Sequence, residues 1–216
     1  MDDLLLEEWS AACVLMEVAL ASPDPDAYFD IRSRWRKVEL TVVAVLGDTG
    51  TMELASDESP YLRALAARDM GSRDMGSRDM SAASGLLERL AADAALIVRV
   101  AVASNPATPV GGLATLYREG SWHIRVELAS NPSSPSWMVT FLAGDRLPRV
   151  RAAVAGLPRP PSFIVAKLLA DPDWHVRAAL AGNKAVSRFT LGTLADDRDL
   201  RVATVGRTTL HMATRP

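Results

Sequence analysis

The stretch LADPDWHVRAALAGN, residues 169–183, decides the fold of this 216-residue chain. Its apolar residues Val176, Ala179 and Leu180 are spaced i, i+3 and i+4, and they therefore share one face of a short helix. Asn183 follows, and asparagine tolerates the left-handed conformation in which many helices end. We therefore predict one short helix with an apolar face, which ends at an asparagine in the left-handed backbone conformation.

The same pattern recurs along the chain every 26 residues, an interval that we call the repeat step. An arginine preceded by an aliphatic residue recurs at this step, with a slightly shorter last step, and an alanine column and a leucine or valine column share the period. Several independent columns with one period establish an internal repeat. The three columns are Arg99, Arg125, Arg151, Arg177 and Arg201; Ala103, Ala129, Ala155 and Ala181; and Leu113, Val139, Val165 and Leu191.

Each unit also predicts a second short helix after the first. Thr108-Pro109 and Ser134-Pro135 restart the chain in two of the units. A hydroxyl can cap free amide groups at a helix start, and proline at the first position loses only an N–H that had no partner. Two helices this short cannot bury their apolar faces alone. We therefore expect adjacent units to stack into a solenoid with one continuous core.

Together with VRVAVASNPATP, residues 98–109, the segment 169–183 resembles the leucine-rich repeat variant (LRV) family and its HEAT-like relatives. The resemblance covers about residues 86–205. It implies an all-α fold, a right-handed α-solenoid of two-helix repeats of about 26 residues, which acts as a scaffold or binding surface. A member of the variant family carries a cysteine-rich iron–sulfur segment ahead of its repeats. Only Cys13 stands there in this chain, so we expect no cofactor.

Residues 1–85 are less regular, and we expect them to form an acidic, mostly helical N-terminal cap. The repeat solenoid with a C-terminal cap is expected at 86–216. Residues 31–46 fit either a buried helix or a strand, and the helix is favoured because the rest is helical. The stretch 68–80 repeats Arg-Asp-Met-Gly-Ser with a period of five, which matches neither helix nor strand and predicts a loop or a frayed helix.

Charge differs between the two parts of the chain. Residues 1–89 hold 9 basic and 17 acidic side chains, a net charge of −8, while residues 90–216 hold 15 and 9, a net charge of +6. This asymmetry suits an anionic partner for the basic part, and it suits head-to-tail self-association equally well. The acidic start, the lack of an apolar run of ~18 residues and the single cysteine lead us to expect a cytoplasmic protein outside the membrane.

Acidic residues accompany the repeat arginines at a fixed spacing of six. In HEAT-like solenoids an acid and an arginine at this spacing form a ladder between neighbouring repeats, and the planar guanidinium suits two-point pairing with a carboxylate. We expect this structural role here, with phosphate binding by the arginines as the alternative. The four pairs are Asp93 and Arg99, Glu119 and Arg125, Asp145 and Arg151, and Asp171 and Arg177.

Two matching aromatic pairs, Trp122-His123 and Trp174-His175, stand at equivalent positions two repeat steps apart. They could form an aromatic ledge for a nucleobase or a peptide side chain, or they could fill space between turns. With Trp137, they are the candidate binding residues. Two histidines so far apart, with no third ligand in register, make a poor metal site, so no metal is expected.

Catalytic signatures are missing from the sequence, which holds no phosphate-binding loop, no nucleophile elbow and no metalloprotease motif. We therefore expect a non-catalytic scaffold or binding protein that binds a macromolecule in the groove of the solenoid, with a protein as the favoured partner. Self-association, with the acidic front of one copy on the basic solenoid of another, is a further hypothesis.

The alternative function is nucleic-acid binding by a protein similar in size and architecture to the HEAT-like DNA glycosylases. The basic charge of the repeat part and its tryptophan and arginine content allow it. Arginines outside the acid pairs would then line one stripe, whereas scattered positions would favour a protein partner. These arginines are Arg118, Arg146, Arg149, Arg159, Arg188 and Arg198.

Overall fold

The computed structural model of the chain describes residues 3–22, 24–46, 51–70 and 77–213, and every regular element in this part is a helix. The all-α expectation is therefore confirmed, and residues 31–46 belong to a helix. The chain divides into two compact units, Met1–Glu119 and Gly120–Pro216. The residues expected as a repeat solenoid, 86–216, thus run through both units. Within the described ranges no helix has the length and apolar character that a membrane span needs.

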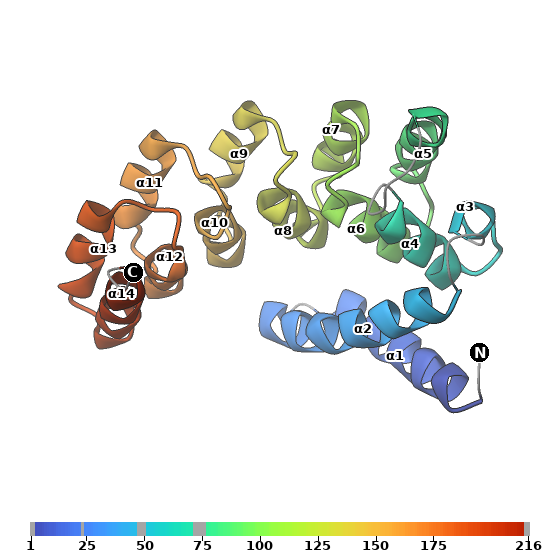
Figure 1. Cartoon of the computed structure of the whole chain (residues 1–216), viewed down its shortest axis with the longest axis horizontal. Helices are drawn as coiled ribbons and strands as arrows, with labels where there is room; N and C mark the ends of the chain where they lie inside the picture. Colours follow the sequence, from blue (N-terminus) through green and yellow to red (C-terminus); the bar gives the residue numbers. More distant parts are fainter. Residues whose placement is uncertain (1–2, 23, 47–50, 71–76, 214–216) are drawn as a thin grey trace. The chain divides into compact units, whose positions relative to one another are not determined.

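In the first unit, a long helical pair is followed by shorter helices (Figure 1). Helix α1 packs on α2, and α4 packs on both α2 and α6, while α5 contacts α6 and α7. The helices are α1 (Asp3–Ala21), α2 (Pro25–Leu46), α3 (Thr51–Leu54), α4 (Pro60–Asp69), α5 (Ser77–Leu90), α6 (Leu96–Ser104) and α7 (Val110–Glu119). Residues 71–76 of the period-five stretch lie outside the described residues.

The second unit consists of two layers of helices (Figure 1). Helices α8, α10, α12 and α14 pack on one another in sequence and form the first layer, and α9, α11 and α13 form a second layer against them. The helices are α8 (Trp122–Ser130), α9 (Ser136–Leu142), α10 (Pro148–Ala155), α11 (Ser162–Leu169), α12 (Trp174–Gly182), α13 (Arg188–Ala195) and α14 (Leu200–Met212).

The core of the second unit follows the aliphatic column that precedes the repeat arginines, because Val150 and Val176 are fully buried. The column does not continue to Leu200, which is exposed. Val202 is buried in its place, and it lies one full repeat step after Val176. The sequence-based placement of Arg201 as the fifth member of the arginine column is therefore wrong. In the last repeat, the position equivalent to that of Arg177 holds the buried Ala203.

The asparagines that end the first helix of a unit do not adopt the left-handed conformation predicted for them. Asn105 and Asn183 have φ values of −80° and −83° and an extended backbone. Their side chains act as clamps instead. Asn105 Nδ2 donates to the carbonyls of Ala67 (2.6 Å) and Met70 (2.7 Å), and its Oδ1 accepts from the N–H of Ala107 (2.7 Å). Each asparagine clamp thereby joins a helix end to the preceding helix of the same layer.

The hydroxyls before the second helices also act differently from the prediction. Thr108 Oγ1 donates to the carbonyl of Val102, and Ser134 Oγ donates to that of Leu128, both at 2.7 Å. For α9 the N-cap residue is Pro135, and no side chain caps the helix. The hydroxyls therefore close the turn back onto a carbonyl in the last turn of the preceding helix.

Candidate functional site

The repeat arginines link successive turns of the chain in a recurring geometry. Arg151 forms a two-point contact with Asp171, from Nε to Oδ2 at 2.7 Å and from Nη2 to Oδ1 at 2.9 Å. Its Nη1 donates to the backbone carbonyl of Asp145 at 2.7 Å. The carboxylate partner therefore belongs to the turn of the following repeat. The acid six residues before the arginine contributes its backbone oxygen.

The two-point contact with a carboxylate recurs at every arginine of the predicted pairs. Each aspartate in these contacts also accepts a hydrogen bond from a backbone N–H two residues later, as Asp145 does from Leu147, so it holds its own turn together. We call this set of contacts the arginine ladder. Its members are Arg99 with Glu119, Arg125 with Asp145, Arg151 with Asp171, and Arg177 with Asp197.

One ladder contact was missed by the sequence analysis. Arg63 forms a two-point contact with Asp93 at 2.8 and 3.0 Å, and its Nη1 donates to the carbonyl of Asp57. The interval from Arg63 to Arg99 exceeds the repeat step by the length of two copies of the five-residue motif. The period-five stretch therefore accounts for the extra length of this repeat. A comparison of the interval between Arg63 and Arg99 with the repeat step could have revealed it.

The contact between Arg177 and Asp197 affects the ionisation of this acid. Hydrogen bonds from Arg177 hold the pKa of Asp197 below its ordinary value of 3.8, against the opposing effect of burial. An acid whose pKa is lowered by folding adds stability above its unfolded-state pKa, and this contribution is lost as the pH falls.

We therefore predict that the free energy of unfolding falls as the pH is lowered from about 5 through the ordinary aspartate range. Urea titrations at a series of pH values will measure this slope. Arg177→Ala removes the cause of one pKa shift, so it should make the dependence on pH shallower. An equal slope in wild type and variant would contradict the link to Asp197.

The predicted Trp–His pairs are each internally stacked. The rings of Trp122 and His123 lie 3.7 Å apart and those of Trp174 and His175 lie 3.6 Å apart, measured between centroids. His123 is buried, while His175 is partly exposed and lies with Nδ1 3.0 Å from Asp173 Oδ1. Each tryptophan thus already has one aromatic partner within the chain.

The ring of Trp174 also contacts the charged side chain of Arg201. The guanidinium carbon of Arg201 lies 3.5 Å from the centre of the Trp174 ring, which is cation–π distance. Arg201 pairs with Asp199 at 2.7 Å. A shallow pocket of about 360 Å³ beside the ring is lined by Pro172, Asp173, Trp174, Arg177, Arg198 and Asp199. The His175 ring and the guanidinium of Arg201 therefore both lie against the Trp174 ring, which leaves little ring surface for a nucleobase.

The arginines outside the predicted acid pairs are scattered over several elements. Arg118 lies in the last turn of α7 in the first unit, whereas the others belong to the second unit. Arg146 and Arg198 lie in turns that precede first-layer helices, and Arg159 lies in a loop that precedes a second-layer helix. Arg149 lies within α10, and Arg188 begins α13 and donates to the carbonyl of Ala213. They do not share one helix or one type of loop.

Three exposed aromatic side chains lie in one column of the repeat. Trp137, Phe163 and Phe189 recur at the repeat step, and each is the second residue of its helix, in α9, α11 and α13. Their exposed fractions are 44%, 58% and 83%. Phe141 is also exposed and meets Trp137 edge to face at 6.4 Å. We call Trp137, Phe163 and Phe189 the aromatic row. Of these, the sequence analysis named only Trp137; the repeat step relates Phe163 and Phe189 to it, but does not reveal that they are exposed.

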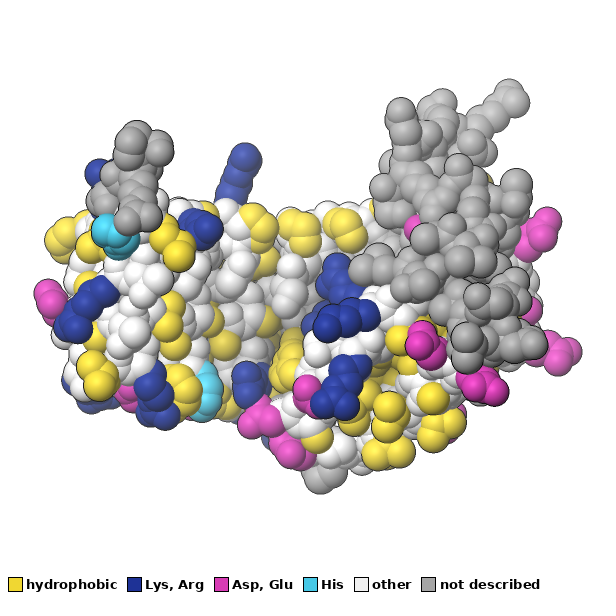
Figure 2. Space-filling model, turned by 60° about the horizontal axis from the view of Figure 1, so that its bottom comes forward, with side chains coloured by type: hydrophobic (Ala, Val, Ile, Leu, Met, Phe, Trp, Pro, Cys, Tyr) yellow, Lys and Arg dark blue, Asp and Glu magenta, His cyan; other side chains and the backbone are white. Residues whose placement is uncertain are grey.

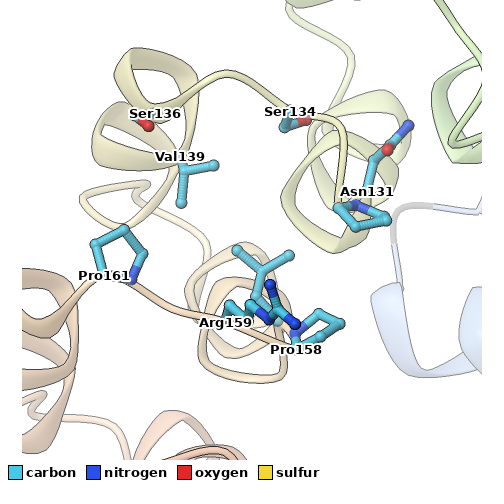
Figure 3. A pocket seen from close by; sticks show the side chains of 9 residues that line it. Asn131, Ser134, Ser136, Val139, Pro158, Arg159 and Pro161 are labelled. Carbon is cyan, nitrogen blue, oxygen red and sulfur yellow. The ribbon is translucent and has the colours of Figure 1, made fainter.

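A pocket lies at the start of α9 (Figure 3), although no residue of the aromatic row lines it. It has a volume of about 420 Å³. Figure 3 shows Ser136 and Val139 of α9 on one side and Pro158, Arg159 and Pro161 of the α10–α11 loop on the other. Arg159 is exposed, and it forms no ion pair or hydrogen bond with the described part of the chain. Its guanidinium is therefore available to a carboxylate of a ligand.

Reactive side chains do not gather in the described ranges. Burial raises the pKa of the Cys13 thiol to about 11, which makes it a poor nucleophile at neutral pH. No three His, Cys, Asp or Glu side chains of residues 3–22, 24–46, 51–70 and 77–213 come together as metal ligands would. A scan against protein-family models finds no match for this chain, and a search of curated proteins finds none either.

Proposed function

We propose that this chain is a right-handed α-solenoid of LRV or HEAT-like repeats that acts in the cytoplasm as a non-catalytic binding protein for a protein partner. The repetition of one ladder contact at a constant separation along the sequence supports the solenoid. The aromatic row, rather than the Trp–His pairs, is the contact surface in this proposal.

The exposure of the aromatic row is the observation that carries the proposed function. A large aromatic side chain in water gains free energy when a partner covers it, and such side chains dominate the energetics of protein interfaces. Trp137, Phe163 and Phe189 gain nothing for the fold from their exposed area. Three consecutive units repeat this arrangement, so the surface extends along the array as solenoid binding surfaces do.

Charge around the row defines the kind of partner. The segments 131–142, 157–170 and 183–195 form the second layer with its preceding loops, and they contain no acidic residue. They contain four basic ones, Arg159, Lys167, Lys184 and Arg188. An acidic partner segment with apolar side chains fits this surface, with a carboxylate at Arg159.

Nucleic-acid binding is the weaker proposal. The arginines of the ladder donate their hydrogen bonds to carboxylates and backbone carbonyls of the chain itself, as Arg151 does. The remaining arginines occupy several kinds of position, in turns, loops and helices, and only Arg146 and Arg198 share an equivalent one, which gives little support to a regular track for a phosphate backbone. Scattered positions of these arginines favour a protein partner over a nucleic acid.

The test is a quantitative comparison of partners captured by the wild type and by a triple variant. In the row variant, Trp137→Gln, Phe163→Gln and Phe189→Gln replace the exposed rings with a side chain that helices accept. We expect proteins that are enriched with the wild type to lose at least tenfold in recovery with the row variant. Val110→Gln with Met212→Gln removes two other exposed apolar side chains and is the control.

Each outcome decides between the two functions. Row-dependent capture that the control variant retains supports the proposal. Partners recovered equally with the row variant would exclude the aromatic row as the contact surface. Salt-sensitive binding of labelled single- or double-stranded DNA, measured by fluorescence anisotropy at two salt concentrations, would favour the nucleic-acid function instead.

A further inference from the structure

Helix α1 is apolar on two opposite faces, and only one of them is covered. The covered face packs on α2, where the rings of Trp9 and Trp35 stack at 5.7 Å. The opposite face holds Val14, Leu15 and Val18, which are 60%, 46% and 60% exposed. With the exposed Ala11 they are spaced i, i+3, i+4 and i+7, so they form one continuous stripe. We call Ala11, Val14, Leu15 and Val18 the α1 stripe.

A helix that is apolar all round is normally buried all round. Figure 2 shows hydrophobic side chains gathered on α1, at the lower right of the view. Beside the stripe, an apolar pocket of about 210 Å³ opens between α1 and α2. Its lining includes Leu15, Ile31, Trp35 and Val38, together with the charged side chains of Glu8 and Arg34. The stripe and the pocket together form a surface that a projecting apolar side chain of a partner would fill.

Helix α1 is acidic, and the units that contain the α1 stripe and the aromatic row carry opposite net charges. Glu7, Glu8 and Glu17 are exposed on α1, and this helix has no basic residue. The first unit holds 11 basic and 19 acidic side chains, a net charge of −8, and the second holds 13 and 7, a net charge of +6. Complementary charge of this kind directs one surface toward the other and raises the rate of encounter.

The spacing of the two surfaces also agrees. Packed helices lie about 8–10 Å apart, so successive units present the aromatic row at a pitch of about 10 Å. On a helix, residues seven apart are separated by about 10.5 Å along the axis. Ala11 and Val18 have this separation. A helix that crosses the row can therefore meet one aromatic side chain every second turn.

We propose that the α1 stripe of one copy docks on the aromatic row of a second copy. This inference rests on the proposed function, because it names the occupant of the same row. The two surfaces differ, so the contact is heterologous, and repeated contacts produce a closed ring or an open filament rather than a two-fold dimer. Apolar burial supplies the affinity, and the acidic and basic borders set which surfaces meet.

The test uses two variants that each lack one surface. The stripe variant carries Val14→Gln, Leu15→Gln and Val18→Gln, and the row variant is the one described above. We expect sedimentation velocity to show wild-type assemblies above the 23.2 kDa of one chain, which grow with protein concentration and shrink at high salt. Each variant alone should remain a monomer. Circular dichroism melting must show that both variants are folded.

Mixing the two variants gives the decisive result. The stripe variant keeps its row and the row variant keeps its stripe, so one contact remains and a 1:1 dimer should form that grows no further. The variant with Val110→Gln and Met212→Gln should assemble like the wild type. A monomeric wild type at its highest soluble concentration, or a mixture of folded variants without a dimer, would overturn the inference.

The failure of this inference and that of the proposed function give different results. If the wild type is monomeric but captures proteins through the aromatic row, the docking of α1 is refuted and the binding function stands. If neither assembly nor capture depends on the row, both are refuted.

Discussion

Arg177→Ala is expected to lower the free energy of unfolding by about 3–5 kcal/mol, because it removes one partner of a buried ion pair. Only 6% of the Arg177 side chain and 10% of the Asp197 side chain are exposed. The substitution would leave the Asp197 carboxylate without its two-point contact and the carbonyl of Asp171 without its donor. Urea unfolding followed by circular dichroism will measure the loss.

Arg201→Ala is the matched control for this prediction. Arg201 also pairs with an aspartate, but 58% of its side chain is exposed, and exposed ion pairs contribute little. We expect Arg201→Ala, which also removes the cation–π contact with Trp174, to lower the free energy of unfolding far less than Arg177→Ala does. Equal effects of the two substitutions would show that burial of the ladder does not determine its contribution.

Asn105→Ala is expected to cost about 2–4 kcal/mol, the second largest effect, because buried polar groups lose their partners. Asn105 is almost fully buried, and its side chain satisfies two carbonyls at the end of α4 and one N–H of its own turn. Alanine can satisfy none of them. The unfolding midpoint in urea will fall, with the slope of the transition unchanged if only native stability is affected.

Thr115→Ala serves as the control for the asparagine clamp. Thr115 is exposed on α7, and its hydroxyl donates only to the carbonyl four residues earlier in the same helix. Alanine has the higher helix propensity, so no loss of stability is expected. A small effect for Asn105→Ala, similar to this control, would contradict a structural role for the clamp.

The helical character of the chain was predictable because periodicity reports burial directly. Val150 and Val176 recur at the repeat step and are buried, as a shared core face requires. The shift at the C-terminal end was harder to predict, because Leu200-Arg201 imitates the earlier aliphatic–arginine pairs in sequence alone. The structure buries Val202 and exposes Leu200, so the constancy of the repeat step outweighed the similarity of the dipeptide.

Side-chain partners across units were not predictable from local sequence. Arg177 was assigned to Asp171, six residues before it, but its carboxylate partner is Asp197. The choice between the two acids depends on where the next turn lies in space, which packing decides. Asn105 was likewise read as a backbone feature, and its role lies in contacts with residues 35 to 38 positions earlier.

The surface that carries the proposed function differs from the one that the sequence indicated for a simple reason. Trp122 and Trp174 attract attention as tryptophans beside histidines, yet each ring is already stacked within the chain. Phe163 and Phe189 look like ordinary core residues in sequence. Only their position at the outer start of a second-layer helix reveals that they are exposed.

The arginine ladder also bears on how such a chain can evolve. Each arginine recognises only the turn that immediately follows its own unit, so the contact is the same wherever a unit stands in the array. Duplication or loss of a whole unit would therefore keep every remaining arginine next to an acid. The inserted residues between Arg63 and Asp93 leave that contact intact as well. Selection can thus change the length of the array without redesigning any of its junctions.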